Sequence, residues 1–292
     1  MEMLYFLYQT LLGAFPFNKS EYPAFIDRVK EYVIKAIREA KVNSGWLRPN
    51  SAYEEAFLKF FDNLLKDEKD NEFLESFRPF QHKIKHYGVF NSLSKSLLKI
   101  TSPGLPDIYQ GTELLDLSLV DPDNRRPVDY EKRKAFLAEI KRKVEGDILC
   151  FISEMMDSPE DGKIKMFLIY QALKARGEHL EIFQRGDYQK VPVLGSLKDK
   201  IVAFSRNWGD RTAIIIAPRL LTDLIKEGEY PLGEQVWQET RISVASGSSY
   251  VWKNVITDRE IQSEDTLWMR DILSDFPVAL LINQITEDTA ES

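Results

Sequence analysis

Hydrophobic side chains recur at the spacing of an α-helix along the N-terminal part of the chain, which predicts a series of helices there. Ser51 and Glu54 form a capping-box pair, so we expect a helix to start at Ser51. Pro79 predicts a bend, because proline removes a backbone donor from the helix. The expected helices run over residues 4–12, 20–41, 51–65, 71–87 and 89–99.

The helix over 4–12 is apolar around much of its circumference, and two interpretations of it stay open. It docks on the rest of the chain, or its exposed side meets a segment that would precede it.

Further along the chain, helices are expected over 130–145, 147–156 and 161–177, and the pattern then changes to short apolar runs separated by Gly, Asp and Asn. Consecutive short strands with turn residues between them are typical of an antiparallel β-sandwich. The expected strands cover residues 188–194, 200–207, 211–218, 236–244, 249–256, 267–272 and 277–282.

Residues 101–130 differ from both patterns, because they are rich in Pro, Gly, Asp and Asn but keep several large apolar side chains. A short strand is expected over Leu105–Tyr109. Loops of this length in a compact domain are usually functional or disordered, and the apolar residues favour an ordered loop. The stretch from Asp121 to Arg126 combines hydrogen-bond donors and acceptors, as sugar recognition requires, although the same residues also suit a self-contained turn.

The overall composition excludes several classes of protein. The chain has 292 residues with 43% hydrophobic and 29% charged residues, so it can bury a core. Its 39 basic and 46 acidic residues give a net charge of −7, which makes nucleic acid a poor expected partner. No apolar run has the ~20 residues that cross a bilayer, so we expect no membrane insertion.

The residues most often used for metal binding and redox chemistry are scarce. Cys150 is the single cysteine, which excludes an intrachain disulfide and favours a cytoplasmic location, and its apolar neighbours predict a core position. His82 and His86 are spaced for one helix face but lack a clear third ligand, so no metal site and no cofactor are expected. Among the five tryptophans, Trp46 and Trp208 are expected to be the more exposed.

The sequence SPGLPDIYQGTELLDLSLVDPDNRRPVDY at 102–130 closely resembles maltooligosyltrehalose synthases of the alpha-amylase superfamily. Four further segments are similar to that family: YQTLLGAFP at 8–16, GDYQKV at 186–191, DKIVAFSR at 199–206 and FPVALL at 276–281. The DPDNRRPVDY motif is the specific one, whereas PGLPDIYQGTE alone would indicate only the superfamily.

The resemblance implies an intramolecular transglucosylation, in which the reducing-end α-1,4 linkage of a maltooligosaccharide becomes an α,α-1,1 linkage. Such retaining chemistry needs two carboxyl groups on either side of the bond. In the family, these groups precede the segment that resembles YQTLLGAFP, so no catalytic residue is expected in this chain. The expected partners are a maltooligosaccharide and a separate N-terminal barrel segment.

The site residues that the resemblance implies lie in the DPDNRRP loop, beside the reducing-end glucose. Arg125 and Arg126 are expected to contact sugar hydroxyls or to order catalytic carboxylates, and the weaker candidates are Asp121, Asp123 and Asn124.

The resemblance implies an α+β fold that combines the C-terminal part of a (β/α)8 barrel and helical insertions (1–184) with an antiparallel β-sandwich (185–292). Two other functions remain open: a non-catalytic glucan-binding or interaction module, and part of a trehalose-releasing hydrolase. The DPDNRRPVDY and FPVALL segments favour the synthase.

Overall fold

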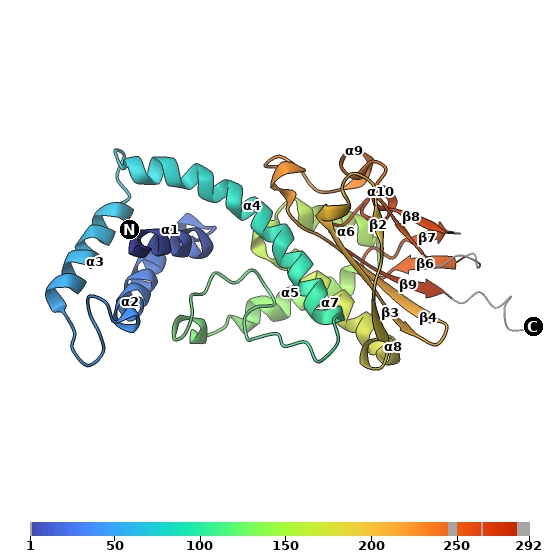
Figure 1. Cartoon of the computed structure of the whole chain (residues 1–292), viewed down its shortest axis with the longest axis horizontal. Coiled ribbons are helices and arrows are strands. Elements are labelled where there is room, and N and C mark those ends of the chain that lie inside the picture. The colour runs from blue at the N-terminus through green and yellow to red at the C-terminus, as the bar shows by residue number, and fades with distance from the viewer. Residues whose placement is uncertain (1, 245–249, 264, 285–292) are drawn as a thin grey trace, which may run out of the picture. The chain divides into compact units, whose positions relative to one another are not determined.

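The chain divides into two compact units, which are described separately. A computed structural model describes residues 2–244, 250–263 and 265–284 (Figure 1). The first unit consists of Met1–Lys85 and Asp116–Val128, and the second consists of His86–Leu115 and Asp129–Ser292. Helix α4 contributes residues to both units.

The first unit is helical, with an aromatic core. Phe15 contacts Phe25 and Phe77, each at 5.2 Å between ring centroids, and Leu7 and Leu11 of the first helix are fully buried beside them. The N-terminal helix therefore docks on this unit, as one of the two interpretations expected, although its Tyr5 is 66% exposed. The helices are α1 (Glu2–Ala14), α2 (Tyr22–Ala40), α3 (Ser51–Leu65) and the first part of α4 (Glu72–Thr101).

Two details of these helices correct the sequence predictions. Helix α3 is capped by Asn50, whose side chain accepts a hydrogen bond from the Tyr53 amide at 3.2 Å, so Ser51 is the first helical residue and not the cap. The helices predicted over 71–87 and 89–99 are one continuous helix, α4. Glycine inside a helix costs only about 0.5–1 kcal/mol, and burial of the residues around Gly88 outweighs that cost.

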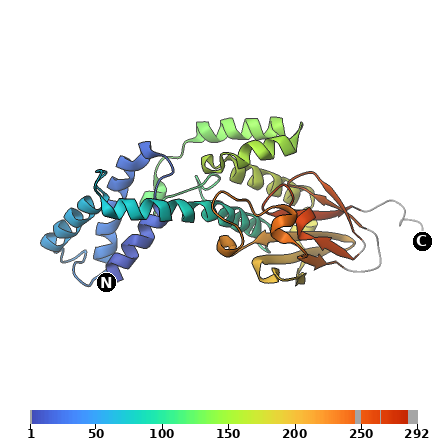
Figure 2. The same cartoon turned by 90° about the horizontal axis from the view of Figure 1, so that it is seen from above.

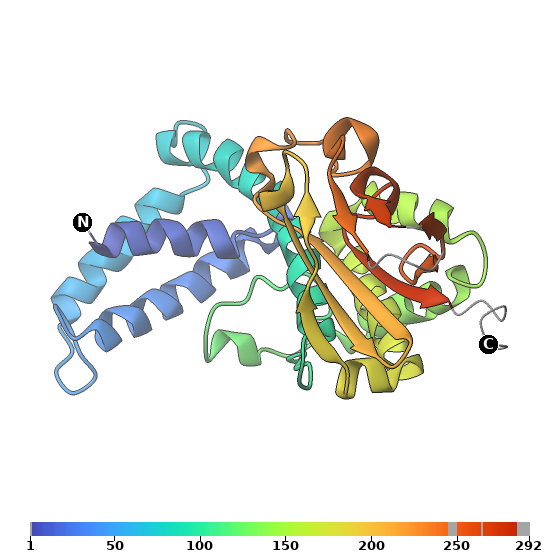
Figure 3. The same cartoon turned by 45° about the vertical axis from the view of Figure 1, so that its right-hand side comes forward.

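The second unit combines helices with two antiparallel sheets. Figure 3 shows the helices from the middle of the chain behind the larger sheet, and Figure 2 shows them from above. Phe167 of α7 packs on Phe276 at 5.8 Å between centroids, so the core extends across residue 184. The helices are α5 (Tyr130–Lys143), α6 (Ile148–Met156), α7 (Lys163–Glu178), α8 (Leu180–Gln184), α9 (Gly233–Trp237) and α10 (Met269–Ile272).

Every strand pairing among the described residues is antiparallel. The larger sheet has the order β1-β3-β4-β9-β6-β7, and the smaller has the order β2-β5-β8. In the register of β3 and β4, Ile201 lies opposite Pro218 and Trp208 opposite Arg211. The strands are β1 (Asp187–Lys190), β2 (Val193–Leu194), β3 (Ile201–Trp208), β4 (Arg211–Pro218), β5 (Arg241–Ser243), β6 (Tyr250–Asn254), β7 (Glu260–Ser263), β8 (Thr266–Trp268) and β9 (Ala279–Gln284).

The structure changes several of the strand predictions. The segment over Leu105–Tyr109 is not a strand: no described segment pairs with it, and Leu105 is 89% exposed. The run over 236–244 includes the end of α9 and all of β5, and the run over 267–272 includes most of β8 and all of α10. Strand β7 was not expected. Ser249, the first residue of the run over 249–256, lies outside the described residues.

The mixed helix-and-sheet class is therefore confirmed, with antiparallel sheets. The partial barrel, the sandwich arrangement and the boundary at 184/185 stay predictions. None of the helices in the described ranges is long and apolar enough to cross a membrane.

An arginine pair, Arg176 and Arg206, is buried in the second unit. Arg206 is 1% exposed, and its guanidinium donates to four backbone carbonyls at 2.9–3.1 Å, those of Thr101, Phe183, Gly186 and Asp187. Arg176 donates to the carbonyls of Ile100 and Gly104. Helix C-termini carry partial negative charge, so the pair fixes the ends of α4 and α8.

Candidate functional site

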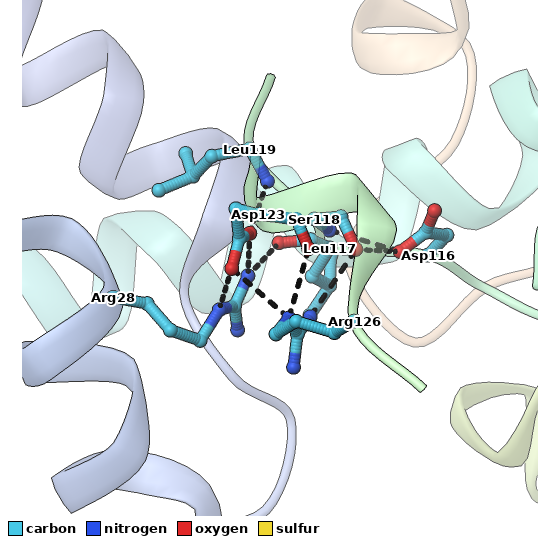
Figure 4. Close-up of polar contacts among 7 residues, drawn as sticks. All are labelled: Arg28, Asp116, Leu117, Ser118, Leu119, Asp123 and Arg126. Atoms are coloured by element: carbon cyan, nitrogen blue, oxygen red, sulfur yellow. Dashed lines mark hydrogen bonds and ion pairs between the residues drawn. The ribbon is translucent and has the colours of Figure 1, made fainter. Parts of the chain in front are cut away.

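The DPDNRRP motif lies in residues 116–128, called the polar loop below, which belong to the first unit together with α2. The motif forms a single 3-10 turn at Asp123–Arg125. Figure 4 shows the side chains that hold this turn in place. The site is therefore built by long-range contacts between the polar loop and α2, a helix more than eighty residues earlier in the chain.

Asp123 is the residue that anchors the polar loop. Its carboxylate accepts hydrogen bonds from Arg28 Nε at 2.8 Å, from Arg28 Nη2 at 2.7 Å and from the backbone amide of Leu119 at 2.7 Å (Figure 4). Only 10% of the side chain is exposed. Burial raises the pKa of Asp123, but the bonds from Arg28 and Leu119 outweigh it and hold that pKa below its usual value. Asp123 therefore remains ionised and has its acceptors occupied.

Two basic residues of α2 belong to this site and were not predicted from the sequence. Arg28 also donates from Nη2 to the carbonyl of Leu117 at 2.8 Å, and Lys35 donates to the carbonyl of Asp121. Residues seven apart on a helix share a face, so a polar stripe within the apolar helix predicted over 20–41 was the available signal. Nothing in the sequence links that stripe to the polar loop.

Arg126 closes the turn from its other side. Its Nε lies 2.9 Å from Asp123 Oδ1 and donates to the Asp123 carbonyl at 3.1 Å, and its Nη2 donates to Ser118 Oγ at 3.2 Å. Ser118 Oγ in turn donates to Asp116 Oδ1 at 2.6 Å. The side chain of Arg126 is 48% exposed, so the residue combines a turn role with an accessible guanidinium edge.

Arg125 and its neighbours are less constrained. The Arg125 guanidinium forms an ion pair with Asp121 through Nε, and 69% of its side chain is exposed. Its other N–H donors make no hydrogen bond within the described residues. Asn124 Oδ1 is buried and has no hydrogen-bond donor in the described part of the chain. The loop thus leaves the exposed donors of Arg125 accessible, whereas the amide oxygen of Asn124 is buried without a donor.

The structure thus brings all five expected site residues together in one turn and separates their roles: Asp123 anchors the loop, and Arg125 presents free donors. Contact of any of them with a sugar stays a prediction.

Trp46 and Trp208 are exposed at 55% and 39%, whereas Trp237 and Trp252 are buried, so this prediction is confirmed. The core prediction for Cys150 is wrong: the residue is exposed, because the helical period turns Phe151 and Ile152 of α6 inward instead.

The histidines form no metal centre within the described ranges, where no group of three His, Cys, Asp or Glu residues is placed to hold an ion. His86 Nε2 instead lies 3.0 Å from the carbonyl of Glu229.

Comparison with known proteins gives one consistent family. A curated protein of Mycobacterium tuberculosis named as a maltooligosyl trehalose synthase is 30% identical over 277 residues, which covers 95% of this chain and 31% of that protein. The solved maltooligosyltrehalose synthase of Arthrobacter ramosus is 28% identical, with a TM-score of 0.74, and this chain spans 32% of it. A glycosyltrehalose synthase structure, labelled DSM5389, is 29% identical over 97% of this chain, with a TM-score of 0.68.

No protein-family model matches the chain. It spans only about a third of the length of the relatives that it matches, while those relatives match nearly all of it. The motifs in the polar loop predicted the same family from the sequence. The chain is therefore a homologue of the C-terminal portion of maltooligosyltrehalose synthases.

Proposed function

We propose that this chain forms the C-terminal part of a maltooligosyltrehalose synthase. The whole enzyme would convert the reducing-end α-1,4 linkage of a maltooligosaccharide into an α,α-1,1 linkage and so leave a trehalose end. The observation that carries the proposal is the similarity to such synthases along 95% of the chain, at 28–30% identity and with a TM-score of 0.74 for a solved relative.

The polar loop supports a role for this chain at the glucose being transferred. In an intramolecular transfer, the released glucose must be held while it turns, because its escape ends in hydrolysis. Arg125 has unsatisfied donors in a fixed fork, which suits hydroxyl groups. Asn124 Oδ1 is buried and would become an acceptor for a sugar only if the turn opened. Arg28, Asp123 and Arg126 position the turn through their mutual contacts.

We infer that this chain is inactive alone and works with a polypeptide that supplies the catalytic carboxyl groups. Retaining transfer needs a nucleophile and an acid/base on opposite sides of the bond. The carboxylate of Asp123 is committed to Arg28 and Arg126, and that of Glu113 is paired with Arg133 at 3.0 Å. Neither is placed as a free nucleophile.

The test uses the chain alone and a chimera that joins the preceding part of the Arthrobacter ramosus synthase to it. Each protein is incubated with maltopentaose, and the non-reducing, trehalose-ended product is measured. We expect no product from the chain alone and product from the chimera. Turnover by the chain alone would contradict the inference of inactivity.

The same assay separates the two other functions. For the hydrolase, a trehalose-ended maltooligosaccharide replaces maltopentaose, and release of free trehalose from it without prior isomerisation would favour that function. A well-folded chimera without turnover that still binds maltopentaose would favour the non-catalytic glucan-binding module.

A further inference from the structure

A small pocket lies between α2 and the polar loop, on a side that the predicted site residues Arg125 and Arg126 do not line. Its volume is about 190 Å³. This is below the ~300–1,000 Å³ of sites for drug-sized ligands, so it suits a single ring. The lining residues, all from the first unit, are Arg28, Glu31, Tyr32, Ile34, Lys35, Trp46, Val120, Pro122 and Asp123.

The exposed Trp46 gives this pocket an aromatic wall. The Arg38 guanidinium lies over its ring, 5.2 Å from the centroid, and is held by Glu54 through two hydrogen bonds of 2.9 and 2.7 Å. Ser44 donates to the same carboxylate. The indole is therefore oriented by a buried network while 55% of its surface remains accessible, which is the arrangement that stacking on the apolar face of a ligand requires.

The charges around the pocket cancel. Arg28 and Asp123 are paired with each other, which leaves Glu31 and Lys35 as the charged groups able to bind a ligand. Glu31 is exposed and makes no hydrogen bond or ion pair with any described residue. Lys35 donates to the carbonyl of Asp121 and lies 3.8 Å from Glu39, so at least one of its three donors remains for a ligand. A site with one acceptor, one donor and no net charge favours a neutral hydroxylated ligand.

We propose that this pocket binds one glucosyl unit of a maltooligosaccharide, with the sugar ring against Trp46 and its hydroxyls on Glu31 and Lys35. Val120 and Pro122 of the polar loop add apolar lining to the pocket. A glucan held here is tethered next to the loop that carries Arg125. The choice of sugar rests on the proposed function, whereas the site itself rests on the pocket.

The experiment uses the full chain labelled with 5-fluorotryptophan, in which ¹⁹F NMR follows its five tryptophans while maltose is added. Trp46→Phe assigns the resonance of interest. Trp208→Phe assigns a matched control, because Trp208 is also exposed and also has an arginine, Arg185, over its ring. We expect a saturable maltose-dependent shift at Trp46 and none at Trp208.

Glu31→Ala tests the polar side of the pocket. Hydrogen bonds to a charged group contribute about 1.5–3 kcal/mol, so maltose should bind about ten- to a hundred-fold more weakly. Glu55→Ala, on the exposed surface of α3, should leave maltose binding unchanged. The Trp46 resonance without maltose should be the same in both variants, because both positions are exposed.

Three results would overturn the proposal: no maltose-dependent shift at Trp46, an equal shift at Trp208, or an equal response to inorganic phosphate. The measurement requires no turnover. An inactive chimera would therefore contradict the proposed function without affecting the proposal for this pocket. Failure to bind maltose would contradict the proposal for the pocket without affecting the proposed function.

Discussion

Each of the two units contains partly or fully buried arginines, but the groups that accept hydrogen bonds from these arginines differ between the units. In the first unit, Arg28 meets the Asp123 carboxylate, and each side chain is 10–17% exposed. In the second unit, Arg176 and Arg206 donate hydrogen bonds only to backbone carbonyls, and no carboxylate lies at ion-pair distance among the described residues. Burial lowers the pKa of both of these arginines, and Arg176 lowers that of Arg206 further.

This difference indicates that the arginine pair of the second unit stabilises the fold, whereas the Arg28–Asp123 pair shapes the candidate site. Carbonyls of helix ends cannot move independently of the helices, so the arginine pair fixes the α4 and α8 termini in one arrangement. A carboxylate on a loop is held by side chains instead, and its removal would release the loop without dissolving a helix. We therefore expect the second cluster to determine stability and the first to determine the geometry of the polar loop.

The largest effect should come from Arg206→Met. Two of the four carbonyls that lose their donor, those of Thr101 and Phe183, accept buried hydrogen bonds. Each buried carbonyl left without a donor costs about 1–3 kcal/mol, so we expect the free energy of unfolding of the second unit to fall by about 2–6 kcal/mol. Denaturant unfolding followed by fluorescence of the buried Trp237 measures this. Arg219→Met, at an exposed position, is the control and should change little. A loss below about 1 kcal/mol for Arg206→Met would contradict this stabilising role.

Arg28→Met should have a smaller and more local effect. Loss of its charged hydrogen bonds to Asp123 should cost about 1.5–3 kcal/mol in the first unit and speed proteolysis within residues 116–128. The stability of Arg28→Lys should lie between those of the wild type and Arg28→Met, since lysine keeps the positive charge but lacks the two-pronged donor geometry of arginine. If Arg28→Met and Asp123→Asn gave fully additive losses, the two residues would not act as a pair.

The Glu54 network makes the first unit sensitive to acid. Hydrogen bonds from Arg38 and Ser44 lower the pKa of Glu54 from 4.5 to about 2. The carboxylate is ionised in the folded state over a range where the unfolded chain already binds a proton. Its stabilising effect is therefore complete above pH 4.5 and is lost as the pH falls towards 2.

Glu54→Gln isolates this effect from the titration of other acids. Unfolding of the wild type and of the variant, compared from pH 6 down to pH 2.5, should converge at the acid end. In the folded wild type alone, the Trp46 resonance should begin to move only at the acid end, as the pH approaches 2. Parallel stability curves would exclude Glu54 as the titrating group.

Arg125→Ala should have the smallest effect on stability, within about 0.5 kcal/mol, because the side chain is mostly exposed. In the active chimera, however, it should lower turnover about ten- to a hundred-fold, if the donors act on the transferred glucose. It should also raise the ratio of free glucose to trehalose-ended product. An unchanged ratio at equal folded fraction would remove Arg125 from the site.

Local patterns were sufficient for the regular elements of the chain. The spacing of apolar residues in α2 and the apolar run of β4 predicted both elements to within about two residues of their ends. Such patterns reflect the burial of one helix face or of a whole strand. Trp46 and Trp208 were predicted to be exposed from turn-like neighbours. The family also followed from contiguous motifs, chiefly the DPDNRRPVDY stretch, and the comparisons confirmed it.

The predictions failed where contacts with distant segments of the chain determine the local structure or the exposure of a residue. The apolar run over 105–109 has strand composition but no strand beside it, so it stays unpaired. Separate helices were predicted over 71–87 and 89–99, but the packing of the residues around Gly88 keeps α4 continuous. Cys150 sits in an apolar run, yet the position of α6 on its neighbours turns it outward.

The sequence by itself determined the chemistry of the polar loop: which donors and acceptors it has, and which family carries them. Only the tertiary structure decided their roles. Arg28 and Asp123 are separated by 95 positions, and no local pattern links them. A carboxylate exposed in a loop and one locked between two arginines have the same letter in the sequence. What distinguishes them is the desolvation and the hydrogen bonds that packing against α2 imposes.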